Sequence, residues 1–285
     1  MRGIGVLLEG GAMRNVFTAG IMDFFLEKEI DVKNVLAVSG GAFVGMNYVS
    51  GQRGRIMDAV VKPMATERIT SGFNLLTGGE FFNMDLLFDE IPKRRSPFDY
   101  DAFIKSGKRF ITTTIDCYTG EAIYYDKFKD MDDFLHVLRV ANSLPLLAKM
   151  GHIDGVPMMD GGMADAIPIE YAMNDGWDKV IVILTRDKDY RKSPKGDIYN
   201  SRWVKLLYHK YKGLIHAIDE RPAKYNARLE QIAELEKEGK IFVYRPEDIE
   251  LKNHEDDAEV LKGYYRAGHE MAERRYEELK AWLSS

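Results

Sequence analysis

The stretch Val35-Leu36-Ala37-Val38-Ser39-Gly40-Gly41-Ala42-Phe43 passes from a short apolar run into a serine with very small neighbours. An apolar segment that ends at Val49 follows at once and has the character of a helix. A strand that turns sharply into a helix at a serine forms a nucleophile elbow, in which bulky neighbours would clash. The usual pattern is G-x-S-x-G, whereas this chain reads A-x-S-x-G. The pentapeptide also fits an ordinary turn, so its meaning depends on the rest of the chain.

A second glycine-rich segment precedes this serine. Residues Gly3–Glu9 are predicted to form a buried strand, followed by the loop Gly10-Gly11-Ala12-Met13-Arg14 and a helix over Val16–Lys28. With a strand at Val35–Val38 and a helix at Ala42–Tyr48, the chain begins strand–helix–strand–helix. This order predicts a three-layer α/β fold, with a mostly parallel central sheet and helices on both faces. Because neighbouring loops meet at the carboxyl ends of parallel strands, the glycine loop should lie beside Ser39.

Further strands and helices are predicted downstream of this opening. The predicted elements are a strand at Arg109–Asp116 with a hairpin partner at Ala122–Tyr125, a helix at Asp130–Asn142, a hairpin over Ile153–Gly162 and a strand at Lys179–Leu184. The hairpin turns at Asp154-Gly155, which we interpret as structural. Residues Gly72–Tyr100 interrupt the pattern, and 72–98 are a candidate lid over the site. Within them, Phe73–Phe88 are suited to line an acyl-binding groove or to join the core.

The chain becomes polar and helical after residue 186. Two amphipathic helices are predicted at Ser201–Ile218 and Arg221–Glu238, then a strand at Ile241–Tyr244 and one long helix over Asp257–Leu283. We therefore divide the chain into a core, residues 3–186, and a mainly helical extension packed on it, residues 187–285. One helical stripe is flanked by basic residues and is expected to pack on the core, with binding to an anionic membrane surface as the alternative. It comprises Trp203, Leu206, Leu207, Leu214 and Ile218.

Composition excludes several classes of function. The 285-residue chain carries a net charge of −5, which argues against a nucleic-acid binder. Cys117 is its only cysteine, expected to be a small core residue, and no metal-binding motif or cofactor signature is present. No apolar run approaches the ~20 residues that span a bilayer, and Met1–Leu8 does not resemble a signal peptide. We expect a cytoplasmic protein without cofactor or nucleic-acid partner, with peripheral membrane contact left open and the oligomeric state unreadable.

A serine nucleophile needs a base and preformed donors for the oxyanion. The hairpin that ends at Asp160-Gly161-Gly162 supplies a carboxylate where a tight glycine turn begins. A Ser–Asp–His order would require His209 or His216. Both histidines lie in a predicted basic helix rather than in a loop after a strand, so we interpret them as surface residues.

These motifs, in this order, resemble the patatin-like phospholipases, and in particular their bacterial branch. The family's loop G-G-G-x-R-G corresponds to Gly10–Asn15, its G-x-S-x-G motif to Ala37–Gly41, and its D-G-G motif to Asp160–Gly162. The segments Ala141–Pro145 and Ala164–Ile169 are also similar to the family's sequence. The resemblance covers residues 3 to about 185.

The resemblance implies a serine acyl-ester hydrolase that uses a Ser–Asp dyad and an acyl-enzyme, with a lipid or a small ester as substrate. Ser39 would be the nucleophile, and Asp160, its pKa raised by burial, would accept the serine proton. The remaining implied roles are oxyanion donors at Gly10, Gly11, Ala12 and Gly40, and motif support from Arg14, Gly41, Gly161 and Gly162. Arg14 would either attract an anionic head group or form a structural salt bridge.

The chain departs from the family's glycine pattern at three positions, and these departures bear on whether it is an active hydrolase. Ala12, Asn15 and Ala37 stand where the family has glycine, and Ala12 is costly only if its φ is positive. These changes motivate the alternative of a non-catalytic binding or regulatory protein with the same fold. A nucleotide-binding α/β protein is a weaker alternative, because G-x-G-x-x-G and an acidic ribose partner are missing.

Overall fold

An eight-stranded sheet forms the centre of the protein. The computed structural model describes residues 3–66, 79–195 and 197–285. The strand order is β5-β6-β3-β2-β1-β7-β8, and β4 pairs with β3 beside this path. The strands are β1 (Ile4–Leu8), β2 (Asn34–Ala37), β3 (Arg109–Asp116), β4 (Ala122–Tyr125), β5 (Gly151–Ile153), β6 (Val156–Asp160), β7 (Lys179–Ile183) and β8 (Ile241–Tyr244).

The middle of the sheet is parallel, and one end is antiparallel. Strands β3, β2, β1, β7 and β8 run parallel to one another, whereas β4, β5 and β6 are added antiparallel. The predicted fold class, a mostly parallel sheet between helices, is confirmed. Strand β8 lies in the region after residue 186, so this region contributes backbone to the sheet as well as helices.

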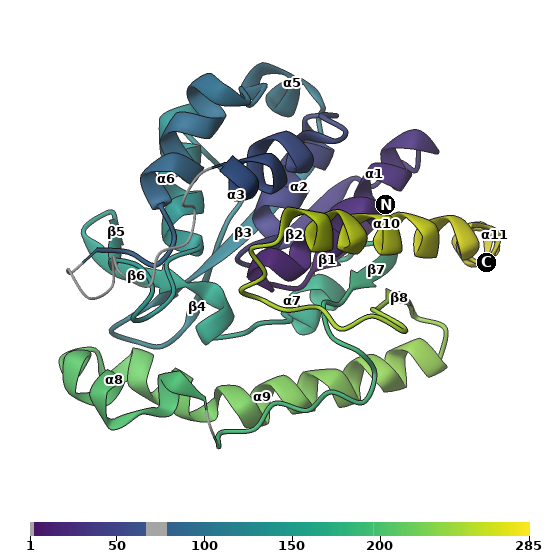
Figure 1. Cartoon of the computed structure of the whole chain (residues 1–285). Coiled ribbons are helices and arrows are strands. Elements are labelled where there is room, and N and C mark those ends of the chain that lie inside the picture. The colour runs from purple at the N-terminus through teal and green to yellow at the C-terminus, as the bar shows by residue number, and fades with distance from the viewer. Residues whose placement is uncertain (1–2, 67–78, 196) are drawn as a thin grey trace.

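Helices cover both faces of the sheet (Figure 1). One face carries α1 (Asn15–Glu27), α2 (Gly41–Val49) and α10 (Ala258–Arg274), and the other carries α7 (Ile169–Asn174) and α9 (Lys212–Lys237). Because strand side chains alternate, Val6 and Leu8 pack on the first face and Leu7 on the second. The remaining helices are α3 (Lys62–Thr66), α5 (Tyr100–Lys105), α6 (Met131–Ala141), α8 (Arg202–Leu207), α11 (Tyr276–Ser284) and the short η1 (Ala12–Arg14), η2 (Met57–Val61), η3 (Leu86–Arg95), η4 (Gly161–Met163) and η5 (Ile198–Asn200).

The predicted boundaries of the helices after residue 200 are wrong. The first predicted helix ends early, with α8, and α9 begins at Lys212 and continues through Pro222. The reason is a close approach between α9 and the β3–β4 turn. A Cβ atom at Gly213 would lie 2.3 Å from the backbone nitrogen of Gly120, and the N–H of Leu214 donates to the carbonyl oxygen of Cys117. This contact, which the local sequence does not reveal, fixes the start of α9.

The single long terminal helix that was predicted is divided into α10 and α11. Asp257 caps α10, as an acidic residue at this position favours, by accepting from the N–H groups of Glu259 and Val260. Arg275 stands between the helices with non-helical angles. Its guanidinium donates to the carbonyl oxygen of Val243 at 2.5 Å, so the break ties this end of the chain to β8.

The expectation that the apolar stripe packs on the core holds for only part of it. Leu214 and Ile218 on α9 are buried, whereas Trp203, Leu206 and Leu207 on α8 are largely exposed. The period of a helix defines which residues share a face, but it does not show whether another element covers that face.

Candidate active site

Ser39 occupies a tight turn between β2 and α2. Its φ is +51°, which lies in the left-handed region that non-glycine residues rarely adopt. The turn closes through hydrogen bonds from the N–H of Gly41 to the carbonyl of Val38 and from the N–H of Ala42 to that of Ser39. The local geometry is therefore that of the strained strand–turn–helix expected of a nucleophile elbow.

The register of β3 places Asp160 close to this turn. Thr112 pairs with Ala37 of β2 and Thr114 with Asp160 of β6, while both threonines also pair with β4. Strands β2 and β6 therefore share the edge of β3 opposite β4. Along this edge of β3, pairing with β2 ends at Thr112, where the chain turns towards Ser39, and pairing with β6 begins at Thr114. Asp160, although far away in sequence, therefore lies beside the serine.

Asp160 is fully buried and only partly hydrogen-bonded. Its Oδ1 accepts from the N–H of Gly162 at 2.8 Å, whereas Oδ2 has no partner among the described residues. Burial raises the pKa of Asp160 to about 6, while the Ser39 hydroxyl, the Gly162 amide and Arg221 lower it. The hydroxyl is thus close enough to influence the carboxylate but does not form a hydrogen bond of good geometry with Oδ2. A buried carboxylate with a free oxygen can accept a proton.

The loop Gly10–Ala12 lies against Ser39, and its amides are not engaged in hydrogen bonds with the described residues. A Cβ atom at Gly10 would lie 2.9 Å from that of Ser39, so only glycine permits this approach. The structure records no hydrogen bond from the N–H groups of Gly10, Gly11, Ala12 and Gly40 to other described residues. The next amide, that of Met13, is already engaged with the carbonyl of Asn253 at 3.4 Å. The amides of Gly10, Gly11, Ala12 and Gly40 are those to which the family resemblance assigns the role of oxyanion donors.

Two of the departures from the glycine pattern have visible consequences. Ala12 has a φ of +49°, the conformation in which its methyl group is costly. Asn15 donates from Nδ2 to the carbonyl of Glu9 at 2.8 Å and to Oγ1 of Thr18, and its Oδ1 lies 2.8 Å from where Gly40 would carry a Cβ. Asn15 therefore holds the loop to the end of β1.

Ser39 lies between two cavities of opposite character. The larger, about 540 Å³, is lined by Ser39, Asp160 and the Gly10–Ala12 loop together with many polar side chains. The smaller, about 60 Å³, also includes Ser39 but is mostly apolar, lined by side chains such as Phe43, Val60 and Phe88. Leu144 lines both cavities. Of the candidate lid, residues 72–98, the first part, 72–78, lies outside the described residues. Four apolar side chains of the described part line the small cavity: Phe82, Met84, Leu87 and Phe88.

Basic side chains dominate the charge of the larger cavity. They are Arg14, Arg186, Arg191, Lys192, Lys195 and Arg221. Arg14 is buried and donates to Oγ1 of Thr185 at 3.2 Å, and its pKa is lowered by burial and by Arg186. Arg14 forms no ion pair with the described residues, so the structural salt bridge considered from sequence is not found among them. Burial, with Arg221 and Arg14 nearby, lowers the pKa of Lys192 to about 8.

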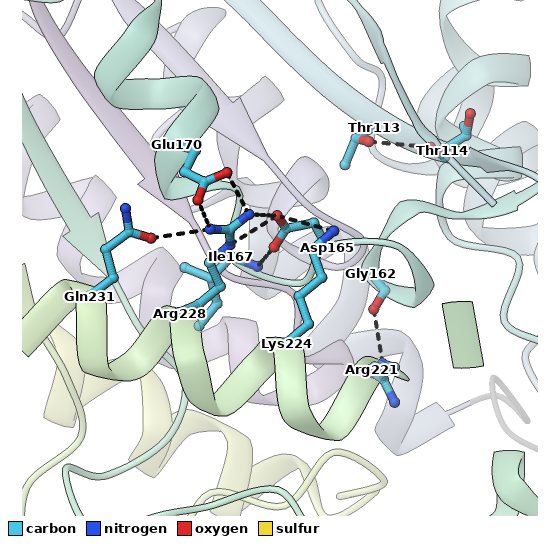
Figure 2. Close-up of polar contacts among 10 residues, drawn as sticks. All are labelled: Thr113, Thr114, Gly162, Asp165, Ile167, Glu170, Arg221, Lys224, Arg228 and Gln231. Atoms are coloured by element: carbon cyan, nitrogen blue, oxygen red, sulfur yellow. Dashed lines mark hydrogen bonds and ion pairs between the residues drawn. The ribbon is translucent and has the colours of Figure 1, made fainter. Parts of the chain in front are cut away.

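Helix α9 holds the turn that carries Asp160 (Figure 2). Nε of Arg221 donates to the carbonyl oxygen of Gly162 at 2.9 Å. Arg228, further along α9, donates to Asp165 at 2.9 Å and also bonds Glu170. Asp165, which follows the D-G-G motif, is buried. The region after residue 186 thus fixes the position of the D-G-G segment.

The two histidines considered from sequence lie on the surface, and a third histidine lines the larger cavity. His209 and His216 are exposed and line neither cavity, as expected of surface residues. His254, by contrast, lines the larger cavity, and burial and Arg14 lower its pKa. Sequence reasoning missed His254, Lys192 and Arg221, because each lies in a polar segment far from the motifs.

Other features were expected to be structural. Asp154 and Gly155 both have positive φ, as the hairpin turn requires. Cys117 is buried, and burial raises the pKa of its thiol to about 12.

Among residues 3–66, 79–195 and 197–285, no three potential metal ligands cluster. Within the same ranges, no helix has the length and apolarity needed to cross a bilayer.

Comparisons with known proteins place these motifs in context. The family model described as patatin-like phospholipase matches residues 6–173, and one described as a domain of unknown function (DUF6363) matches residues 211–284. The uncharacterized protein YjjU of Escherichia coli (strain K12) is 24% identical over 240 residues, which cover 78% of this chain and 66% of that protein. The matched region is therefore slightly less than two thirds of the relative. The crystal structure of VipD from Legionella pneumophila aligns with a TM-score of 0.46 and 11% identity, covering 96% of this chain and 67% of that one.

Proposed function

The chain belongs to the patatin-like phospholipase family, and on this basis we propose that it hydrolyses carboxylic esters of lipids with Ser39 and Asp160 as a catalytic dyad. One observation carries the proposal. Asp160 is buried, its Oδ2 has no partner among the described residues, and burial raises its pKa to about 6. The hydroxyl of Ser39, a residue held in a strained elbow, is close enough to lower that pKa. Near neutral pH this carboxylate is ionised and yet basic enough to accept a proton.

In the proposed reaction, Asp160 takes the proton of the Ser39 hydroxyl while Oγ attacks the ester carbonyl carbon. The resulting oxyanion is held by the free amides of the Gly10–Ala12 loop and Gly40. When the intermediate collapses, the alcohol leaves with the proton from Asp160, and the acyl group remains on Ser39. Water, deprotonated by Asp160, then attacks the acyl-enzyme and releases the carboxylic acid, and Ser39 regains its proton.

The two cavities support an amphiphilic substrate. The small apolar cavity beside Ser39 is suited to the first carbons of an acyl chain. The larger basic cavity on the other side is suited to the alcohol portion and favours one with negative charge, such as a phosphate ester. A short ester with a neutral alcohol portion would benefit from the small apolar cavity but not from the charge of the larger one.

Product analysis tests this proposal. We expect the protein to release free fatty acid from a dispersed phospholipid and alcohol from p-nitrophenyl butyrate, and Ser39→Ala and Asp160→Asn to abolish both. Failure of the wild type to turn over either ester would leave a binding or regulatory protein of this fold. Equal turnover by Ser39→Ala and wild type would rule out Ser39 as the nucleophile.

Contact with a membrane is part of the proposal, since a lipid hydrolase must reach lipids in a bilayer or micelle. We propose that this contact is peripheral.

A further inference from the structure

Exposed apolar side chains gather on and just before α8. Trp203, Leu206 and Leu207 are 76%, 64% and 63% exposed, and Ile198 is 56% exposed. We name Ile198, Trp203, Leu206 and Leu207 the α8 patch. The other large exposed apolar side chains of the described residues, Ile104, Tyr118 and Val260, come from three different segments of the chain. A cluster of this kind is typical of a surface that binds a partner.

The geometry of α8 presents these side chains to one side. Trp203, Leu206 and Leu207 are spaced by three and four positions and therefore share a helix face. The opposite side is held to the protein by buried Val204 and by Tyr208, whose hydroxyl accepts from the N–H of Leu146 at 3.1 Å. The helix is thus anchored with its apolar face outward.

Charge around the patch identifies the kind of partner. Between Asp197 and Asp219 the sequence has no acidic residue, but it has four basic ones, Arg202, Lys205, Lys210 and Lys212. Lys205 pairs with Asp219 at 2.8 Å, and the other three form no ion pair within the described ranges. In a chain of net charge −5, this is a local positive region. Tryptophan and leucine beside exposed lysines and arginines complement an anionic lipid surface rather than a purely apolar groove.

The patch also adjoins the mouth of the larger cavity. Ile198 and Tyr199 belong to η5, just before α8, and line the cavity that contains Ser39. Ile198 therefore belongs to both the rim and the patch. A surface that rests on lipid at this point would place the opening next to lipid head groups.

We propose that the α8 patch docks the protein on anionic phospholipid bilayers. Trp203, Leu206 and Leu207 enter the interface between head groups and acyl chains, while the basic side chains contact lipid phosphates. Delivery of substrate to Ser39 rests on the proposed hydrolase function, but the docking itself does not.

Vesicle binding by the full chain tests the proposal. We expect co-sedimentation with vesicles of phosphatidylcholine plus phosphatidylglycerol, stronger than with phosphatidylcholine alone and weakened by salt. The triple variant Trp203→Ser, Leu206→Ser, Leu207→Ser should bind at least about tenfold more weakly. Removing Arg202, Lys210 and Lys212 as glutamines should lower binding to the anionic vesicles by about fivefold per cation.

A matched control is available at the other end of the molecule. Ile104 is 57% exposed and belongs to α5, a helix at the opposite end of the molecule from α8 in Figure 1, so Ile104→Ser should leave binding unchanged. Trp203 is also a reporter, because Trp177 is buried and Trp282 partly so. Its emission should shift to the blue on anionic vesicles, and the shift should disappear in Trp203→Phe.

Several outcomes would overturn the proposal. These are equal binding to neutral and anionic vesicles, unchanged binding by the triple variant, or a wild-type dimer in light scattering that the triple variant dissociates, which would make a second copy the occupant. Turnover of p-nitrophenyl butyrate should be unaffected by the triple variant. If the wild type fails to hydrolyse any ester but binds through the patch, the hydrolase proposal fails and the docking proposal stands.

Discussion

Nε of Arg221 donates a 2.9 Å hydrogen bond to the carbonyl oxygen of Gly162, two residues after Asp160. Arg221 lies on α9, far from Gly162 in sequence, so the C-terminal region fixes the turn that carries the proposed base. The positive charge of Arg221 also lowers the pKa of Asp160, against the larger effect of burial. One side chain therefore acts on both the position and the titration of Asp160.

Replacement of Arg221 should separate these effects from a general loss of charge. In Arg221→Met, the lost hydrogen bond should lower kcat/KM for a soluble ester by about tenfold. Without the cation, the pKa of Asp160 should rise further, so the acid limb of the pH profile should move to higher pH. The measurement is kcat/KM against pH with p-nitrophenyl butyrate.

Lys224 provides the matched control, because it lies one turn along α9 and its Nζ is 3.8 Å from Asp165 rather than near Gly162. Lys224→Met removes the same charge and should keep the wild-type acid limb. If Arg221→Met and Lys224→Met give the same profile, Arg221 has no particular role in positioning or titrating Asp160.

Asp160→Asn should be inactive and yet more stable than the wild type. The folded-state pKa, about 6, is above the ordinary value of 3.8, so the folded protein favours the protonated carboxyl. As pH rises from about 4 to about 6, the unfolded state gives up the proton first, and wild-type stability falls by ~3 kcal/mol at most. Asparagine cannot ionise, so it avoids this loss.

Denaturant unfolding of both proteins across this pH range measures the difference. The stability advantage of Asp160→Asn should grow from pH 4 to pH 6 and remain constant above it. A difference that is independent of pH would show that the carboxyl does not titrate with a raised pKa in the folded protein.

The strain at Ser39 predicts an unusual order of stability. The residue has a φ of +51°, which costs alanine roughly 1–2 kcal/mol but costs glycine little. Ser39→Gly and Ser39→Ala should both lose activity, but thermal unfolding should occur at a higher temperature in the glycine variant. A less stable glycine variant would indicate that this turn is not strained.

The small apolar cavity should determine the length of the acyl chain. Val60 is buried in its wall, and Val60→Phe would fill much of the volume of about 60 Å³. We expect kcat/KM to fall sharply for octanoyl and longer p-nitrophenyl esters. The acetyl ester is the internal control and should be hydrolysed nearly as before. An equal loss for all chain lengths would mean that the acyl chain does not enter this cavity.

The sequence predicts the architecture well where local signals are strong. The buried β-branched strands and the Asp154-Gly155 turn have clear local signals, and the small residues around Ser39 leave room for its strained turn. The structure contains all three features. The fold class follows from their order. Because the carboxyl ends of β1 and β2 lie side by side, the loops that follow them both line the larger cavity, together with Asp160. Of the residues expected around the site, those that line it are Gly10, Gly11, Ala12, Arg14, Ser39, Asp160 and Gly162.

What the sequence does not predict depends on tertiary contacts. The start of α9 is fixed by the close approach of Gly213 to Gly120. The apolar face of α8 is exposed because no other described element packs over it. The basic wall of the cavity comes from side chains such as Lys192 and Arg221, which look like ordinary surface residues in sequence. Only the folded chain brings them to Ser39.

The central claim is that Ser39 is a nucleophile activated by Asp160, and covalent labelling tests it most directly. A fluorophosphonate probe should add one label per chain, peptide mass spectrometry should locate it on Ser39, and labelling should slow strongly in Asp160→Asn. Ser39→Ala should remain unlabelled. A label on a different residue, or a Ser39→Ala variant that is labelled as readily as the wild type, would contradict the proposed dyad.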